Sequence, residues 1–241
     1  ERTLMPRFSA NLSMLYAEHS FLDRFAAAAA DGFDAVEYLG PYDHEPGEVA
    51  RALERAGQEQ ALFNLPSGDW AGGERGLGGL PGREKEFRAG VETAIRYAAA
   101  LGCGQVNCLA GIAPPGAEAA HEAVLIENLR FAAERLGEAD LRLLLEPINT
   151  RDIPGFLVST TDHALRVMDA VGSENLWLQY DFYHTQVMQG DLWPTFERLQ
   201  PRIAHVQVAD HPGRHELDLD HNGEAGGVVR AGGDDAAAVG F

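Results

Sequence analysis

Acidic, amide and imidazole side chains stand at the ends of apolar segments in this chain. The segment LWLQYDFYHTQ, residues 176–186, is an apolar run that ends in Asp181 and is followed by His184. Glu146 likewise closes LRLLLE, and Gln207 lies within IAHVQVAD. Two carboxylates and an amide oxygen form a hard-oxygen set that suits Mg²⁺ or Mn²⁺ better than Zn²⁺. These residues predict a divalent-metal site that polarises a carbonyl and stabilises an enediolate.

The segments that carry these residues alternate between strand and helix patterns. Apolar or alternating runs predict strands over residues 6–14, 33–40, 60–66, 105–111, 141–149, 176–181 and 203–210. Helical spacing of apolar residues, together with start and stop signals, predicts helices over 21–32, 47–57, 83–102, 117–140, 162–172 and 192–201. This alternation favours a parallel α/β sheet, and runs such as RLLLE suit strands that are buried on both faces.

A TIM barrel accounts for this pattern better than a dinucleotide-binding fold. The first predicted strand leads into SANLSMLYAEHS, which contains no glycine and so no G-x-G-x-x-G motif. We therefore predict a (β/α)8 TIM barrel whose eighth βα unit is missing or altered. Active sites of such barrels lie at the C-terminal strand ends. The polar residues expected there are Asn11, Glu37, Asn64, Asn107, Glu146, Asp181, His184, Gln207, Asp210 and His211. Any single one could equally be a solvated strand end or a helix cap, but the barrel brings them all to one mouth.

Several longer motifs resemble one known family. They are MPRFSANLSMLY, FDAVEYLGPYD, ALFNLPSGDWAGGERGLGGLPGRE, LLLEPIN, QYDFYHTQ and HVQVADHPGRHE. These motifs are similar to those of the hydroxypyruvate isomerase family, within the xylose isomerase-like TIM barrels. The resemblance covers residues 5–216, which we expect to form the isomerase domain. It implies interconversion of hydroxypyruvate and 2-hydroxy-3-oxopropanoate (tartronate semialdehyde), and related members isomerise 2-oxo-tetronates.

The resemblance also implies roles for individual residues. The family uses two catalytic glutamates, and Glu146 matches the first of them, at the end of strand five. Asp181 and Gln207 match metal-site positions on strands six and seven. We expect substrate contacts from His184, Asn64, Arg214 and His215, and His184 could instead serve as an outer hydrogen-bond partner. Proton transfer and a metal-assisted hydride shift would use the same ligands, so the sequence leaves both open.

The C-terminal stretch, residues 217–241, departs from the family pattern. The family continues through a helix and an eighth strand that ends in the second catalytic glutamate, whereas this chain reads LDLDHNGEAGGVVRAGGDDAAAVGF. Nearly all of these residue types have codons that can begin with G or C, which is expected of GC-rich coding sequence read out of frame. The alternatives are therefore a shifted frame and a natural Gly/Ala/Asp-rich tail. The second carboxylate has no assigned residue, and a catalytically impaired, truncated relative is an open alternative.

Charge and composition exclude some partners. The net charge is −18, with 19 Lys+Arg against 37 Asp+Glu, which argues against nucleic acid and anionic membranes as partners. No apolar block reaches the roughly 18 residues of a membrane span, and no secretory signal is visible. Cys103 and Cys108 are expected to be small core residues of a cytoplasmic protein. The expected partner is a small keto or hydroxy acid. An oligomer or the tail would cover the sheet edges, and a sugar epimerase or dehydratase is the alternative enzyme.

Overall fold

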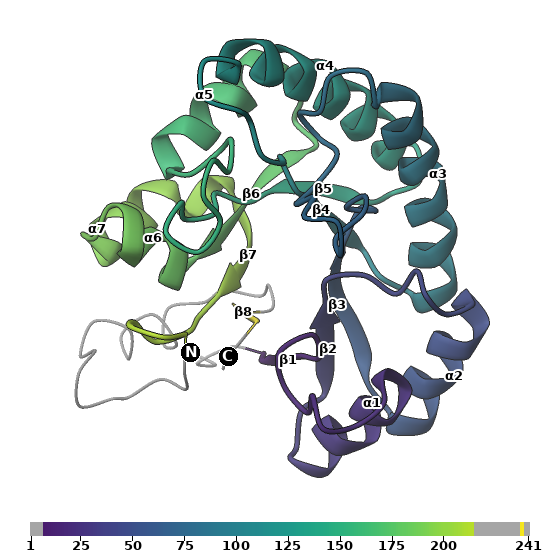
Figure 1. The fold of residues 1–241 in the computed structure, drawn as a ribbon. Helices are drawn as coiled ribbons and strands as arrows, with labels where there is room; N and C mark the ends of the chain where they lie inside the picture. The colour runs from purple at the N-terminus through teal and green to yellow at the C-terminus, as the bar shows by residue number, and fades with distance from the viewer. Residues whose placement is uncertain (1–6, 215–236, 239–241) are drawn as a thin grey trace.

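The computed structural model describes residues 7–214 and 237–238, and it contains one curved parallel sheet. The strands follow one another in chain order (Figure 1): β1 (Ser9–Asn11), β2 (Ala35–Tyr38), β3 (Glu59–Asn64), β4 (Gln105–Cys108), β5 (Arg142–Leu145), β6 (Leu176–Asp181), β7 (Ile203–Gln207) and β8 (Ala237–Ala238). The predicted α/β barrel fold is confirmed. The described residues are consistent with the predicted missing or altered eighth unit, since beyond Arg214 they comprise only the two-residue β8, parallel to β7.

Helices lie outside the curved sheet and cover its outer face (Figure 1). They are α1 (Phe21–Ala30), α2 (Pro46–Ala56), α3 (Glu84–Leu101), α4 (Glu118–Gly137), α5 (Thr161–Val171), α6 (Phe182–Met188), α7 (Leu192–Leu199) and the short 3₁₀ turn η1 (Gln200–Arg202). Within the described ranges, no helix has both the length and the apolar character needed to cross a membrane. The predicted tail, residues 217–241, lies outside the described residues except for β8.

Local signals explain where the helices begin and end. Pro46 occupies the first turn of α2, where its missing N–H costs no hydrogen bond. Gly57, Gly102 and Gly172 follow α2, α3 and α5 in the left-handed conformation that glycine adopts without strain. Thr160 caps α5 by accepting the N–H of His163 at 3.2 Å. These ends set the short loops that connect each helix to the next strand.

The sheet register aligns polar residues at the C-terminal strand ends. Asn11 lies opposite Glu37, and Asp181 lies opposite Gln207. Asn64 and Asn107 are likewise paired across β3 and β4. Parallel strands in register carry their ends to one edge of the sheet, so these side chains share one layer of the barrel.

Strands and helices share an apolar core, and both cysteines belong to it. Leu143, Leu145 and Leu178 are fully buried on the central strands. Cys103 and Cys108 are buried and unbridged, as small core residues are expected to be. Burial raises the pKa of each thiol to about 12, so neither is a reactive thiolate at neutral pH.

Candidate active site

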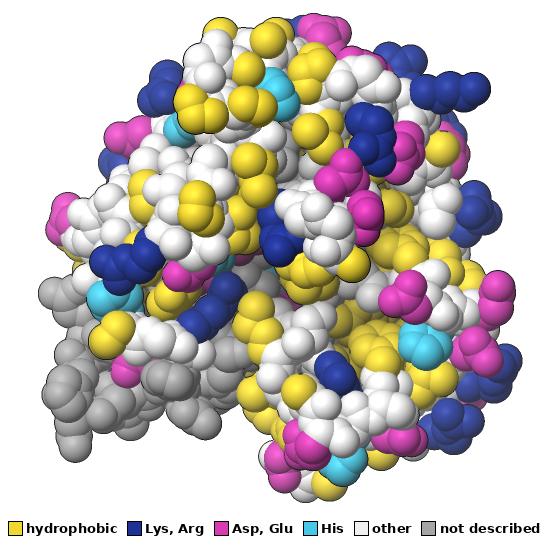
Figure 2. All heavy atoms as spheres, viewed as in Figure 1, with side chains coloured by type: hydrophobic (Ala, Val, Ile, Leu, Met, Phe, Trp, Pro, Cys, Tyr) yellow, Lys and Arg dark blue, Asp and Glu magenta, His cyan; other side chains and the backbone are white. Residues whose placement is uncertain are grey.

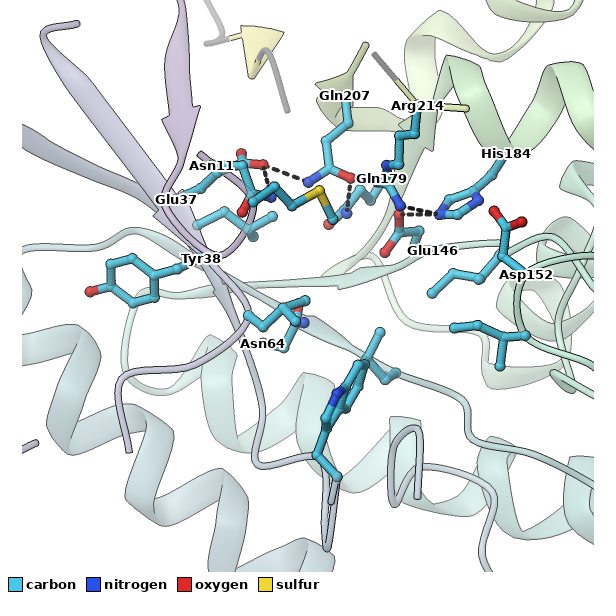
Figure 3. A pocket seen from close by; sticks show the side chains of 17 residues that line it. Asn11, Glu37, Tyr38, Asn64, Glu146, Asp152, Gln179, His184, Gln207 and Arg214 are labelled. Atoms are coloured by element: carbon cyan, nitrogen blue, oxygen red, sulfur yellow. Dashed lines mark hydrogen bonds and ion pairs between the residues drawn. The ribbon is translucent and has the colours of Figure 1, made fainter. Parts of the chain in front are cut away.

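A cavity of about 140 Å³ opens at the C-terminal ends of the strands. Its polar wall includes Glu37, Glu146, Gln179, His184, Gln207 and Arg214, which converge from strands, from α6 and from the segments after β5 and β7 (Figure 3). Its apolar wall includes Met14, Leu109, Ile148 and Trp70. Figure 2 shows Lys and Arg side chains interspersed with Asp and Glu around the face seen in Figure 1. A small cavity with one polar and one apolar side suits a small polar ligand.

Glu146 is the buried acid at the centre of the polar wall. It follows β5, is 5% exposed, and its Oε2 accepts a hydrogen bond from Asn107 Nδ2 at 3.3 Å. Burial raises the pKa of Glu146 to about 8, and the carboxylate of Asp181 adds to that rise while Arg214 opposes it. A carboxyl group with a pKa near neutrality exchanges its proton readily, which is what a general acid or base requires.

Asp181 has two roles, which explains why an apolar strand ends in an acid. Its Oδ1 accepts the backbone N–H groups of Tyr183 at 2.7 Å and His184 at 3.2 Å, and so caps α6. Its Oδ2 accepts a hydrogen bond from Nη2 of Arg214 at 2.9 Å, and Arg214 lines the cavity. The cap holds the carboxylate in place, and its second oxygen is joined to the cavity wall through Arg214.

His184 is neutral and its tautomer is determined by its neighbours. Burial lowers its pKa to about 4, with Asp181 opposing the shift and Arg214 adding to it. Asn149 Nδ2 lies 2.7 Å from His184 Nδ1 and also donates to Asp152 Oδ2 at 2.9 Å, while Asn149 Oδ1 accepts the Asp152 N–H at 2.8 Å. Asn149 therefore presents its NH₂ group to Nδ1, which must accept.

The remaining proton of His184 is consequently on Nε2, which points into the cavity. Nε2 lies 3.6 Å from Asp181 Oδ2 and 3.8 Å from Glu146 Oε1. Arg214 Nη1 is also 3.5 Å from Nε2, but both atoms carry hydrogen, and the shorter contact with Asn149 decides the tautomer. His184 is thus a hydrogen-bond donor to whatever occupies the cavity.

The polar wall fits a metal ion. Ligand atoms of Glu146, Asp181 and His184 all lie within 4.8 Å of one another. Gln207 is adjacent, and its Oε1 accepts from Gln179 Nε2 at 3.0 Å. Gln179 Oε1 is buried with no hydrogen-bond partner within the described part of the chain. Closely spaced buried carboxylates with an unpartnered amide oxygen beside them form an oxygen-rich, electronegative pocket that a cation would neutralise.

Comparison with known proteins agrees with this geometry. The family model described as xylose isomerase-like TIM barrel matches residues 25–228. Hydroxypyruvate isomerase of Escherichia coli is 52% identical over 214 residues, which cover 88% of this chain and 83% of that protein. 2-Oxo-tetronate isomerase of Cupriavidus necator is 48% identical over 216 residues, 89% of this chain and 83% of that protein. The chain belongs to the hydroxypyruvate isomerase family.

Solved structures extend the family comparison to the fold. A Brucella melitensis crystal structure described as an AP endonuclease, family 2, superposes with a TM-score of 0.88 at 39% identity, covering 98% of this chain and 92% of that one. 3-Keto-D-glucoside 4-epimerase of Escherichia coli has a TM-score of 0.75 at 18% identity and covers 99% of this chain and 92% of that one, which shows a shared fold. As a member of the hydroxypyruvate isomerase family, the chain is an isomerase.

The structure brings together most residues that the family resemblance singles out. Asn64, His184 and Arg214 line the cavity together with Glu146 and Gln207. Asn64 Oδ1 accepts from Asn107 Nδ2 at 3.1 Å, and Arg214 lies over the ring of Tyr183 at 5.3 Å. His215 lies outside the described residues. The roles of these residues in substrate and metal binding remain predictions.

Other residues in or beside the cavity were not singled out from the sequence. Gln179 stands two positions before Asp181, so both side chains point to the same side of β6, and that period-two spacing is a usable signal. Asn149 and Asp152 form a local turn through reciprocal hydrogen bonds, which the Asn-x-x-Asp spacing suggests. Trp70 reaches the cavity from the glycine-rich segment, and no local pattern marks that contact.

Proposed function

We propose that this chain interconverts hydroxypyruvate and 2-hydroxy-3-oxopropanoate by proton transfer through an enediolate. The observation that carries the proposal is the pairing of Glu146, whose pKa is raised to about 8, with the neutral Nε2–H donor of His184 in one small cavity. A carboxyl group that exchanges its proton near neutral pH and a hydrogen-bond donor a few ångströms from it are the groups needed to enolise a hydroxy ketone. The named relatives act on this class of small acids, which supports the same assignment.

Each step of the proposed reaction uses a residue of the cavity. Arg214 binds the substrate carboxylate, since a guanidinium pairs well with a planar carboxylate. Glu146 removes a proton from the hydroxyl-bearing C3, and the C2 carbonyl becomes an enediolate oxygen. His184 Nε2–H donates a hydrogen bond to that developing charge. Return of a proton to C2 yields the aldehyde product, with the hydroxyl hydrogen transferred from O3 to O2.

A divalent cation, Mg²⁺ or Mn²⁺, belongs to the proposal. Glu146, Asp181 and the Gln207 oxygen would hold it, because these are the hard oxygen donors of the wall. When bound, it supplies a Lewis acid that stabilises the enediolate charge. His184 stays outside this ligand set because its cavity-facing nitrogen carries hydrogen. The buried, unbridged cysteines support a reducing, cytoplasmic setting as part of the same proposal.

The test is an isomerisation assay with defined metal content. The purified 241-residue chain is incubated with hydroxypyruvate in D₂O, with chelator, Mg²⁺ or Mn²⁺, and the products are followed by NMR. Deuterium at C2 indicates proton transfer, whereas a hydride shift retains the substrate hydrogen. A parallel reaction with a 2-oxo-tetronate compares the two substrates named for the relatives. Absence of turnover with either acid under every metal condition contradicts the proposal.

Glu146→Gln is the first variant to examine. It keeps the shape of the side chain but removes the proton acceptor, so turnover should fall by roughly 10²–10⁴-fold. The matched control is Glu54→Gln, the same chemical change at an exposed position on α2, which should leave turnover unchanged. Mn²⁺ titration calorimetry of Asp181→Asn tests the ligand set independently of activity. Wild-type turnover in Glu146→Gln would remove Glu146 from the mechanism.

A further inference from the structure

A chain of buried hydrogen bonds starts beside the active site at Glu37. This carboxylate stands on β2, is 1% exposed, and lines the same cavity as Glu146. It accepts four hydrogen bonds, from Gln207 Nε2 (2.6 Å), His205 Nε2 (2.8 Å), Asn11 Nδ2 (3.0 Å) and Ser9 Oγ (3.3 Å). Carboxylate oxygens are acceptors, so each of these partners presents a hydrogen to Glu37.

At the end of the hydrogen-bond chain that is farthest from the cavity, a backbone carbonyl determines which side-chain atoms donate and which accept. Gln105 Nε2 donates to the carbonyl oxygen of Ala61 at 3.1 Å, which identifies that end of the amide as NH₂. The same Nε2 lies 3.2 Å from His205 Nδ1, so Nδ1 accepts and the ring proton is on Nε2. His205 therefore donates to Glu37, in agreement with the acceptor-only carboxylate. The donor–acceptor direction is the same at each of these links.

On the cavity side of Glu37 the hydrogen bonds also run towards its carboxylate, from Gln179 to Gln207 and from Gln207 to Glu37. Gln207 must turn its NH₂ towards Glu37, which leaves its Oε1 to accept from Gln179 Nε2 at 3.0 Å. Gln179 thereby has its NH₂ group directed at Gln207, and its Oε1 is a buried acceptor without a partner within the described residues. Figure 3 shows Glu37, Gln207 and Gln179 side by side along the cavity wall.

We propose that Glu37 and His205 are positioning residues that orient Gln207 and Gln179, and that Gln179 Oε1 accepts a hydrogen bond from the substrate hydroxyl group. The inference rests on the proposed function in taking a small hydroxy acid as the ligand. A buried acceptor without a partner is unfavourable, so a ligand that donates to it gains affinity. A ligand that lacks the hydroxyl leaves the acceptor unpaired. Gln179 therefore selects hydroxy acids over their deoxy analogues.

Binding of an inert ligand pair tests the role of Gln179. Glycerate and lactate differ only in the C3 hydroxyl, and neither is a hydroxy ketone that the proposed reaction can enolise. We expect calorimetry to show glycerate binding the wild-type chain roughly 10–100-fold more tightly than lactate. Gln179→Met keeps the length of the side chain without an acceptor oxygen, and should bring the two affinities within about threefold. An unchanged affinity ratio in Gln179→Met overturns the proposal.

Variants of Glu37 test the positioning step. Glu37→Gln allows either end of the Gln207 amide to face position 37, so the glycerate-to-lactate ratio should fall several-fold. Adding Gln207→Glu to Glu37→Gln puts the amide donor at position 37 and the carboxylate at position 207. An acceptor oxygen then faces the NH₂ group of Gln179 again, so the glycerate-to-lactate ratio should be restored. Ser9→Ala removes the longest hydrogen bond to Glu37 but leaves Gln207 oriented, so it should keep the wild-type ratio. If folded Glu37→Gln keeps the wild-type ratio of glycerate to lactate affinity, the positioning role is contradicted.

A ligand-free measurement separates this inference from the proposed substrate class. If wild-type protein binds neither acid, the proposed substrate class and the Gln179 role both fail, but orientation can still be measured. The Gln207 carboxamide ¹H–¹⁵N pair is assigned by its loss in Gln207→Glu. Its shifts should change in Glu37→Gln, where the carboxylate acceptor is gone, and stay constant in Ser9→Ala. Unchanged Gln207 shifts in Glu37→Gln overturn the positioning role.

Discussion

Asn149 determines what His184 can do chemically. The contact of 2.7 Å between Asn149 Nδ2 and His184 Nδ1 keeps the ring proton on Nε2, facing the cavity. Asp152 fixes Asn149 in turn through two hydrogen bonds. This arrangement uses a pair on the loop after β5 to control an imidazole on α6. A second layer of hydrogen bonds often orients the residues that touch the reacting atoms.

Asn149→Asp should reverse the His184 tautomer. An acidic oxygen beside Nδ1 accepts rather than donates, so the ring would carry hydrogen on Nδ1. We expect kcat to fall by roughly 10²-fold because the enediolate oxygen loses its donor when His184 is neutral. Imidazole ¹⁵N shifts report the tautomer directly, and Thr150→Ser on the same loop is a conservative control. Normal kcat together with an Nδ1-protonated ring would show that the tautomer is irrelevant.

The raised pKa of Glu146 should make the stability of metal-free protein depend on pH. Burial, and then Asp181, raise the pKa from the ordinary 4.5 to about 8. The folded state thus holds this proton more tightly than the unfolded state, so the stabilisation is complete below about pH 4.5 and is lost as the pH rises through 8. In chelator, the free energy of unfolding of wild type should fall across this range relative to Glu146→Gln. Denaturant titrations measure it, and a pH-independent difference would contradict the assignment.

Residue types at strand ends predict part of the site, and burial decides the rest. Glu146, Asp181 and Gln207 stand at the ends of apolar runs, so the sequence identifies them. Gln179 lies within a strand, and only the cavity shows that its amide faces the ligand space. The pKa values of Glu146 and His184 depend on burial and on each other's neighbours, which no local pattern encodes.

At the scale of elements, the residues that end helices can be recognised in the sequence when their signal is local. Gly57, Gly102 and Gly172 close three predicted helices with positive φ angles, as expected for glycine after a helix. The helix α6 was not predicted from the sequence, because its seven residues are too few to show helical periodicity. Its one sequence signal is Asp181, the N-cap, and this residue was interpreted instead as the functional acid at the end of a strand. A residue that is both a helix cap and a site residue is hard to recognise from sequence in both roles.

The glycine-rich segment after β3 packs too closely on β4 for larger residues. A Cβ on Gly76 would lie 2.3 Å from the carbonyl oxygen of Leu109, and its φ is +120°. Leu109 also lines the cavity. The segment therefore fixes one apolar wall of the site.

Gly76→Ala should destabilise the protein and weaken substrate binding together. Backbone strain at positive φ costs about 1–3 kcal/mol, and the clash with Leu109 adds to it. Gly73→Ala is the matched control, because Gly73 has φ +101° and open space around its Cβ. We expect thermal unfolding to show a larger loss for Gly76→Ala, with a raised KM only in that variant. Equal losses in both would mean that strain alone, rather than the close approach, matters.

At the scale of the whole molecule, barrel curvature joins residues that are distant in sequence. Glu37 meets His205 across 168 positions and Gln207 across 170. The alternation of strands and helices predicts the fold, and hence that strand ends converge. The particular partners across the barrel follow from strand tilt and register, including the register shifts on β2 and β6. The sequence therefore predicts the mouth of the barrel but not its hydrogen-bond network.

One similar structure is described as an AP endonuclease, but the net charge of −18 predicts that this chain does not bind nucleic acid. Binding to a phosphate backbone requires clustered Lys and Arg, whereas this chain has 19 of these against 37 Asp and Glu. Within the described residues, the one metal-sized group of acidic, His and Cys side chains is Glu146, Asp181 and His184, at the base of a cavity of about 140 Å³.

That cavity is small for a nucleotide extruded from a duplex, and its wall is already rich in carboxylates. We expect no cleavage of a duplex with an abasic site in Mg²⁺ or Mn²⁺, and no binding by fluorescence anisotropy at micromolar protein and physiological salt. An undamaged duplex of the same length is the control, and hydroxypyruvate turnover in the same preparation shows that the protein is active. Salt-dependent micromolar binding, or cleavage that Asp181→Asn abolishes, would overturn this prediction and assign the metal site to phosphate chemistry.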